Sequence, residues 1–553
     1  MTAVEGDDSV REDETFARCD IDEASACVGK GSPRGAEILV CGVRRQDQDG
    51  GGENGVSLCT WVEWAACINP DEVCREVWSA VRYEDAAHPS PHEPVVMSLD
   101  KRLDPRHRTW AGSDRFVPKT FVQPFVRFTR IEAASGIVLL AAAALALLWA
   151  NSPWSDAYFQ LFDETRFVFE LGPIHLDESL AEIVNDGLMA IFFFVVGLEI
   201  KREFVIGELR DPRAAALPVV AAFGGMLIPA LIYFALVARS RPEALAGWAI
   251  PMATDIAFAV GVVALLGRRL PPAAKLFILA VAIADDIGAI LVIALFYTSD
   301  LSMAWLAVGA SLLVLIGFGQ RVGVRSSLFY GSAAVAVWFA MLESGVHATI
   351  AGIALGFLTP ARALYSSEEF ETKARDILDT YPVGDSPEDD EKSDYEAELL
   401  STVAIESISP LNRLENRLLP WTSYVIVPLF ALANAGVDFR GADPVEILTN
   451  PVAQGVAAGL IFGKTIGISL FTWLAVRTGL GRLPPNTTWR HIVGLAALAG
   501  IGFTVSLFIT NLAFADQALG DLARIGIFAG SLLAGIIGSL ILLGRSREHR
   551  VPT

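Results

Sequence analysis

The sequence has no cysteine after Cys74, although the chain runs to 553 residues. None of the cysteines forms a C-x-x-C pair, and their spacings match no zinc site. We therefore predict no resident cofactor or structural metal, and we expect reduced thiols if this segment faces the cytoplasm. The six cysteines are Cys19, Cys27, Cys41, Cys59, Cys67 and Cys74.

Two targeting and energy-coupling motifs are also missing. No G-x-x-x-x-G-K-[ST] phosphate loop is present, which disfavours an ATP-driven pump. The first residues, Met1–Asp22, are acidic and polar, so we expect no cleavable signal peptide. Met97 stands just before a basic stretch and is an alternative start of translation.

Long apolar runs are absent before Ile131 but recur from there to Leu543. The hydrophobic fraction of 53% and the mean hydropathy of +0.45 are too high for a soluble chain of this length. Runs of about 18 residues or more can cross a bilayer core of about 30 Å. The pattern predicts an all-α polytopic membrane protein with about twelve spans, near 132–151, 178–199, 214–238, 249–266, 274–297, 301–319, 327–343, 345–359, 418–437, 452–474, 490–512 and 522–544.

The net charge of -20 belongs to two appendages rather than to the membrane body. Roughly -13 falls on residues 1–100 and roughly -11 on the segment 366–410. The charge therefore indicates neither an acidic nor a basic partner, and no nucleic acid is expected. We divide the chain into an N-terminal extension (1–118), a transmembrane domain (119–546) with an acidic cytoplasmic loop insert (366–410), and a tail (547–553).

The N-terminal extension is rich in Gly, Pro and Asp, with two apolar patches, Ile38–Val43 and Val56–Ile68, and one possible short helix, Asp71–Tyr83. This composition is typical of a disordered or weakly folded segment, and a small regulatory module is the alternative. A basic approach to the first span follows, which suits an anionic inner leaflet. It consists of Lys101, Arg102, Arg106, Arg108, Arg115, Lys119, Arg127 and Arg130.

Lysine and arginine gather in the loops that follow even-numbered spans. By the positive-inside rule these loops and both termini are cytoplasmic, in a bacterial inner membrane. The segment Tyr158–Leu171 between the first two spans alternates apolar and polar residues, which predicts a short external hairpin.

Five charged residues stand inside otherwise apolar spans: Asp186, Asp255, Asp285, Asp286 and Lys464. A charge at bilayer depth costs several kcal/mol, so each requires a reason. A structural ion pair would explain any one of them. Four acids and one base together indicate a cation pathway.

Asp285 and Asp286 are neighbours in the middle of one span. Adjacent residues on a helix point about 100° apart, so one can line an ion cavity while the other faces a neighbouring helix. Two close carboxylates in a low dielectric resist simultaneous ionisation, and either a sodium ion or a proton can relieve that repulsion. Competition for one site is the simplest physical basis for antiport.

Two spans are interrupted at corresponding places in the two halves. The fourth carries polar Thr254 and Asp255, and the eleventh reads Gly500-Ile-Gly-Phe-Thr504. Interrupted helices in the two halves indicate a midplane binding site. Asp255 suits the positive ends of broken helices and Lys464 the negative ends, while Thr254 offers oxygen to a hard cation.

A charge cluster closes the second span with Glu199, Lys201, Arg202 and Glu203. From its chemistry alone, this cluster is better explained as a group of snorkelling interfacial side chains than as a functional cluster. Asp186, thirteen residues earlier, lies roughly 20 Å deeper and is a candidate for a cytoplasmic funnel.

The chain resembles the NhaA sodium/proton antiporter family, in order and over about residues 120–546. The matching stretches are NDGLMAIFFFVVGLEIKRE (185–203), ATDIAFAVGVVALLG (253–267), AIADDIGAILVIALFYTSDLS (282–302), SGVHATIAG (344–352), PLFALANAGV (428–437), GKTIGISLF (463–471) and GIGFTVSLFI (500–509).

The resemblance implies twelve helices in inverted repeats, with the fourth and eleventh helices discontinuous and crossed. It implies that Asp285 and Asp286 bind protons and sodium, with Asp286 the direct ligand. Thr254 and Asp255 then belong to the helix crossing, and Lys464 pairs with Asp285. It further implies electrogenic exchange and a homodimer formed through the external hairpin 158–171.

The resemblance also implies a role for Asp186 in the cytoplasmic funnel, and for Glu199, Lys201, Arg202 and Glu203 in the response to pH. The N-terminal extension and the insert 366–410 depart from the family pattern. Because the insert lies on the face where pH control would be exerted, the pH profile is the property that transfers least directly.

Three other functions are compatible with a polytopic membrane protein, but the sequence favours none of them. A sodium-coupled symporter of an organic anion needs a larger pocket with basic groups, and Lys464 is the only buried base in the spans. A membrane sensor needs a folded effector domain, for which the sequence gives no sign. A proton channel does not need broken helices, which are typical of alternating access.

Overall fold

The computed structural model describes residues 27–28, 37–41, 59–63, 134–171, 174–267, 270–298, 301–382, 387–440, 445 and 449–544. The chain divides into two compact units, Met1–Asp104 and Pro105–Thr553. The tail 547–553, the short helix expected at Asp71–Tyr83 and the basic stretch before the first span lie outside the described residues.

The first unit contains a small antiparallel sheet in the order β1-β2-β3. Its strands are β1 (Cys27–Val28), β2 (Glu37–Cys41) and β3 (Cys59–Glu63). Strands β2 and β3 coincide with the two apolar patches of the extension, and Leu39 of β2 pairs with Trp61 of β3. The apolar patches therefore become paired strands.

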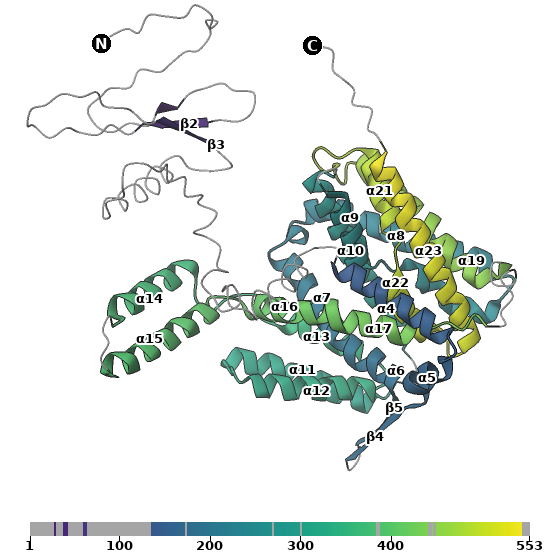
Figure 1. Cartoon of the computed structure of the whole chain (residues 1–553), viewed down its shortest axis with the longest axis horizontal. Coiled ribbons are helices and arrows are strands. Elements are labelled where there is room, and N and C mark those ends of the chain that lie inside the picture. The colour runs from purple at the N-terminus through teal and green to yellow at the C-terminus, as the bar shows by residue number, and fades with distance from the viewer. Residues whose placement is uncertain are drawn as a thin grey trace, which may run out of the picture. The chain divides into compact units, whose positions relative to one another are not determined.

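The second unit is built mainly from helices (Figure 1). Within the described ranges, six helical runs are long and apolar enough to cross a membrane, and two pairs of bent helices raise the number to eight. The six runs are α6 (Leu180–Ile183) with η5 (Val184–Leu188) and α7 (Met189–Val205), α8 (Pro212–Val237), α10 (Pro272–Phe296), α11 (Met303–Val322), α19 (Pro451–Ala458) with η10 (Gly459–Gly463) and α20 (Lys464–Arg477), and α23 (Gln517–Leu543).

The two bent pairs each contain a break of a few residues. One pair is η7 (Pro242–Met252) and α9 (Ile256–Leu266), bent by 43°, and the other is α21 (Trp489–Leu498) and α22 (Phe503–Ala513), bent by 47°. The other helices are α4 (Ala134–Ala150), α5 (Ser155–Phe159), η4 (Gln160–Glu164), η6 (Glu208–Arg210), α12 (Ser327–Leu342), α13 (Thr349–Leu358), α14 (Ser367–Thr380), α15 (Pro387–Glu406), α16 (Pro410–Trp421), η9 (Thr422–Ile426) and α17 (Val427–Asn434).

Helix starts follow local sequence signals. Ser179 and Glu182 form a reciprocal capping box at the start of α6. Asp211 caps α8 by accepting from the backbone N–H of Arg213, and Pro212 occupies the first helical position, where its missing N–H costs nothing. The charged loop after α7 thus turns directly into the next span.

The helices pack in two groups, which we name by their central members. The α7 group comprises α4, α6, α7, α11, α12, α13, α16 and α17, and the α8 group comprises η7, α8, α9, α10 and α19 to α23. Within the α8 group, α8 and α20 approach closely because two glycines meet: a Cβ on Gly467 would lie 2.1 Å from the carbonyl oxygen of Gly224. Contacts between α4 and α9 and between α17 and α22 join the groups.

The hairpin predicted at Tyr158–Leu171 lies further along the chain. Its strands are β4 (Arg166–Leu171) and β5 (Ile174–Ser179), paired antiparallel, whereas the residues before them are helical. Tyr158 and Phe162 lie four residues apart, are both buried, and bring their rings within 5.0 Å. The strand predicted for the first half of Tyr158–Leu171 is therefore wrong, because the aromatic residues there follow the helical repeat.

The acidic insert is a helical hairpin rather than a loop, so that prediction is corrected too. Helices α14 and α15 contact each other and project from the bundle (Figure 1). Ser366 and Glu369 form a capping box. Ile377 and Val403 are buried, although most of the acidic side chains that the structure describes on these helices are exposed. The charge count obscured a narrow apolar face on each helix.

Candidate ion-binding site

The two broken helices meet at their breaks. The backbone N–H of Asp255 donates to the carbonyl oxygen of Ile501 at 2.7 Å, and the hydroxyl of Thr254 donates to that of Ala499 at 2.8 Å. Both threonine and aspartate are buried. These bonds fasten the break between η7 and α9 to the break between α21 and α22.

Asp255 caps two helices at this crossing. It accepts from the backbone N–H of Phe258 at the start of α9, and from the hydroxyl and backbone N–H of Thr504 at the start of α22, at 2.7 and 3.2 Å. The N-termini of both half-helices therefore point at one carboxylate, which suits their positive dipole ends.

The crossing depends on the absence of a side chain at Gly502. A Cβ there would lie 2.3 Å from the Ser506 hydroxyl oxygen and 2.9 Å from the carbonyl oxygen of Ala253. The backbone N–H of Gly502 donates to the hydroxyl of Ser531 on α23 at 3.3 Å. The G-I-G motif thus lets the backbones of the two breaks approach closely.

Lys464 and Asp285 form a buried ion pair beside the crossing. The Nζ atom of Lys464 on α20 donates to Oδ2 of Asp285 on α10 at 2.6 Å, and their side chains are 0% and 2% exposed. The pairing implied by the family resemblance is present in the structure. The ammonium neutralises one of the two adjacent carboxylates.

Asp286 lies next to this pair, and one oxygen of its carboxylate has no hydrogen-bond donor in the part of the chain that the structure describes. It is buried, and neither its Oδ1 nor the Oδ1 of Asp285 has a hydrogen-bond partner among the described residues. Buried carboxylate oxygens without donors are expensive unless a cation or proton approaches them. The two free oxygens and the hydroxyl oxygen of Thr254 are hard ligands of the type that sodium accepts.

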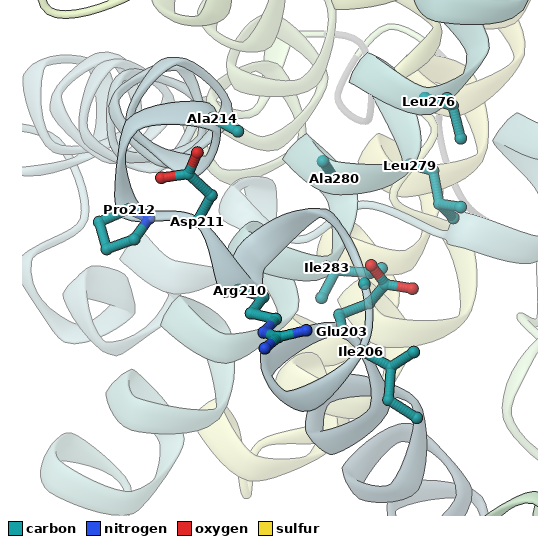
Figure 2. Close-up of a pocket in the computed structure, with 11 residues that line it drawn as sticks. Glu203, Ile206, Arg210, Asp211, Pro212, Ala214, Leu276, Leu279, Ala280 and Ile283 are labelled. Carbon is teal, nitrogen blue, oxygen red and sulfur yellow. The ribbon is translucent and has the colours of Figure 1, made fainter. Parts of the chain in front are cut away.

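A pocket of about 770 Å³ opens towards this site, at the end of the bundle that we call the pocket end. Figure 2 shows its lining from the end of α7, the turn into α8 and one face of α10. Among the α10 residues that line the pocket, Ile283 comes last in the sequence. It precedes Asp286 by three residues, which is about one helical turn. The opposite end of the bundle, which carries β4 and β5, is called the hairpin end.

The charge cluster at the end of α7 lies at the pocket end. Glu203 lines the pocket, and Glu199 is half-buried one turn earlier. Lys201 donates to the carbonyl oxygens of Phe357 and Thr359 at 2.7 and 2.5 Å, so it caps the C-terminus of α13.

Arg202 forms an ion pair with Glu415 on α16 and approaches Glu203 at 3.7 Å. The cluster therefore joins α7 to α13 and α16. Side chains that only reached towards the membrane surface would not make these contacts.

Asp186 is not among the residues that line this pocket. It lies in η5, and Glu203 is seventeen residues later on the same helical run, about 25 Å away along the axis. Trp338 donates to its backbone carbonyl oxygen at 2.8 Å. The number of intervening residues predicts how far Asp186 lies from the charge cluster along the helix. It does not predict that Asp186 lies closer to the hairpin end than to the pocket end.

Two residues of the assembly were not predicted as site residues. Thr504 belongs to a motif that is conspicuous through its glycines, and a hydroxyl side chain on an apolar helix gives no signal of its own. Glu415 follows the insert in a polar helix, where nothing in the sequence distinguishes it from its exposed neighbours.

Comparison of the sequence with known proteins identifies a family. Residues 126–542 match the family model described as Na+/H+ antiporter 1. The chain belongs to this family. An Na(+)/H(+) antiporter NhaA from Syntrophobacter fumaroxidans is 46% identical over 439 residues, which cover 78% of this chain and 92% of that protein.

Two further relatives carry the same name. The one from Koribacter versatilis is 46% identical over 442 residues, covering 77% of this chain and 93% of its own length. The one from Anaeromyxobacter sp. is 48% identical over 423 residues, covering 76% and 91%. As an antiporter-family chain with these apolar helices, the protein is a multi-pass membrane protein.

Proposed function

We propose that this protein is a sodium/proton antiporter that exports sodium or lithium in exchange for entering protons. The observation that carries the proposal is the buried Asp286, whose Oδ1 has no hydrogen-bond partner among the described residues, beside the Asp285–Lys464 pair and one turn beyond the pocket. The names of the relatives agree with this function.

The charges of the site explain the exchange. Two carboxylates and one ammonium leave a net charge of -1, which either a sodium ion or a proton on Asp286 cancels. Since both cannot neutralise the same carboxylate at once, arrival of one favours release of the other. When sodium also draws Asp285 away from Lys464, the ammonium loses its partner and can release a second proton, which makes the exchange electrogenic.

The crossing holds this exchange site at mid-membrane. Asp255 neutralises the two half-helix N-termini and therefore positions the crossing rather than binding the transported ion. Thr254 keeps its oxygen lone pairs available while its proton is bonded to Ala499. Alternating access then exposes the site to one side at a time.

We further propose twelve spans arranged as inverted repeats, with the fourth and eleventh discontinuous. The six long runs, the two bent pairs, the three shorter apolar helices and the run from α16 to α17 support that count. The pocket end is then cytoplasmic, because the loops there carry most of the lysine and arginine. Both termini are cytoplasmic, the location is the bacterial inner membrane, and the role is sodium and pH homeostasis.

Two regulatory and assembly features follow the same proposal. The cluster of Glu199, Lys201, Arg202 and Glu203 holds α7 to α13 and α16 at the cytoplasmic end of the pocket. Its contacts change with protonation, and this makes transport respond to pH. A homodimer forms through the external hairpin, whose strands are now placed at Arg166–Leu171 and Ile174–Ser179.

The symporter alternative lacks a site for its anion. In the described part of the chain Lys464 is the sole base that is fully buried, and Asp285 already neutralises it. An organic anion would need a further unpaired donor near the crossing.

The proposal is tested by sodium-dependent proton movement in inverted membrane vesicles across pH. Addition of sodium should collapse an imposed pH gradient with wild-type protein, whereas Asp286→Asn should give the background of empty vesicles. The control is Asp390→Asn, which changes an exposed carboxylate on α15 and should behave as wild type. A folded wild type that is silent with sodium and lithium at every pH would contradict the proposal.

A further inference from the structure

The interface between the α7 group and the α8 group is open as a pocket at one end and filled by side chains at the other. Helix α22 runs from the crossing towards the hairpin end. Phe508 lies four residues after Thr504 and Asn511 seven residues after it, about 6 and about 10 Å along the axis. Each of these two residues belongs to one layer of side chains, and the two layers lie between the ion site and the hairpin end.

The first layer is aromatic. The ring of Phe508 lies 5.3 Å from that of Phe193 on α7 and 6.4 Å from that of Phe430 on α17, measured between centroids. None of the three side chains is more than 3% exposed. A packed aromatic layer contributed by both groups excludes water and ions from the hairpin end of the interface.

The second layer is made of amides. Asn511 donates from Nδ2 to Oδ1 of Asn434 at 2.6 Å, and this bond crosses from the α8 group to the α7 group. On either side the bonds stay within one group: Asn434 donates to Asn185 at 2.8 Å, and Arg524 donates to Asn511 at 3.0 Å. The amide pair therefore links a polar cluster of the α7 group to one of the α8 group.

We propose that Asn434 and Asn511 form a latch which, with the Phe508 layer, is the outer gate of this transporter. The inference rests on the proposed antiport by alternating access. One end of such a transporter closes while the other opens, and here the pocket end is open. The latch stabilises the inward-open state, and it must break before the ion site can face outward.

The test compares apparent sodium affinity from the two sides in proteoliposomes of defined orientation. Asn434→Leu and Asn511→Leu each remove the crossing bond and should shift the population towards the outward-open state. The apparent affinity should improve about threefold to tenfold from the outer side and weaken from the cytoplasmic side. The double variant should shift the two affinities no further than a single variant does, because either substitution alone already removes the bond that crosses between the groups.

A matched control is Asn151→Leu. Asn151 is also an amide at the hairpin end, but it bonds Val437 and Phe439 in the segment that follows α17, and α4 and α17 both belong to the α7 group. This variant should shift neither affinity relative to the other. Equal losses from both sides in the latch variants, or no change at all, would overturn the latch, while a silent wild type would overturn the antiport proposal itself.

A cross-link gives a second test that does not depend on the stability of the leucine variants. In a background with the six native cysteines changed to serine, Asn434→Cys combined with Asn511→Cys is oxidised in the full-length protein. The disulfide should arrest exchange, and a reductant should restore it. A quantitatively cross-linked protein that still exchanges at the uncross-linked rate would overturn the proposal.

Discussion

At the scale of single residues, the apolar spans made the central site predictable. Asp255, Asp285, Asp286, Thr254 and Lys464 were identified because a charge or hydroxyl at bilayer depth needs a partner, and the structure brings them together around the crossing. Which carboxylate pairs with Lys464 was implied by the resemblance and not by the residues alone. Asp186 shows the limit, since its depth could be counted but not the end of the molecule to which it is closer.

The Asp285–Lys464 pair makes a stability prediction. Lys464→Met leaves the Asp285 carboxylate buried without its partner, which should lower the free energy of unfolding by about 3–5 kcal/mol. The double variant Asp285→Asn with Lys464→Met removes both charges and should recover most of that loss. Denaturant unfolding of the purified protein in detergent checks this, and a double variant as unstable as the single one would refute it.

Glu178 on β5 makes a pH prediction. Burial, then the neighbouring Glu182 and Asp186, raise the pKa of Glu178 from 4.5 to about 7, although Arg166 opposes this. The folded hairpin therefore favours the protonated carboxyl. The stability that protonated Glu178 gives the folded hairpin is therefore fully present below about pH 4.5 and is lost as the pH rises towards 7.

Hydrogen exchange of the β4 and β5 amides, corrected for intrinsic rates, measures this effect. Wild-type protection should fall between pH 5 and pH 7.5, and Glu178→Gln should remove the dependence. Glu164→Gln, which changes an exposed carboxyl just before the hairpin, should retain it. Identical pH profiles for Glu178→Gln and wild type would contradict the account.

At the scale of elements, hydropathy predicted where the helices lie, because each apolar run must satisfy its backbone internally. The predicted spans and the observed runs agree to within a few residues in most places, as for 214–238 and Pro212–Val237. The sequence pattern is misleading at two elements. In Tyr158–Leu171 the aromatic residues of a short helix show the alternation of a strand, and in the insert the exposed charges hide a narrow apolar face.

The break in the eleventh span makes a prediction for an element. Gly502→Ala places a Cβ against the carbonyl oxygen of Ala253 and the hydroxyl of Ser506, so the two breaks must move apart. Exchange should be lost while the helical content is retained, as measured by vesicle assay and circular dichroism. Gly331→Ala on α12, where a Cβ meets nothing within 4 Å, should leave exchange unchanged, and a fully active Gly502→Ala would contradict the role of the crossing.

At the scale of the whole molecule, the sequence predicts a membrane domain with two acidic appendages, but it does not predict how the insert is attached. The backbone N–H of Leu364 donates to the carbonyl oxygen of Glu406 at 3.0 Å, so the two ends of the insert lie side by side. Arg325 on the loop between α11 and α12 adds an exposed ion pair to Glu406. The insert is therefore a module added onto a complete bundle.

Excision of 366–406 tests this view. With Tyr365 joined to Ser407 by a short Gly-Ser linker, the protein should fold and exchange at a rate within about twofold of wild type, since an exposed ion pair contributes at most about 1 kcal/mol. Removal of Pro387–Glu406 alone should be harmful, because Ile377 of α14 would lose its cover. Loss of folding after complete excision would show that the hairpin belongs to the transport unit.

Competition between sodium and protons for the aspartate pair is the central claim. It is measured most directly as proton release when sodium is added to the purified, weakly buffered protein. Wild type should release protons in proportion to the sodium bound, and Asp286→Asn should bind no sodium and release none. Sodium binding without proton release in the wild type would contradict the account.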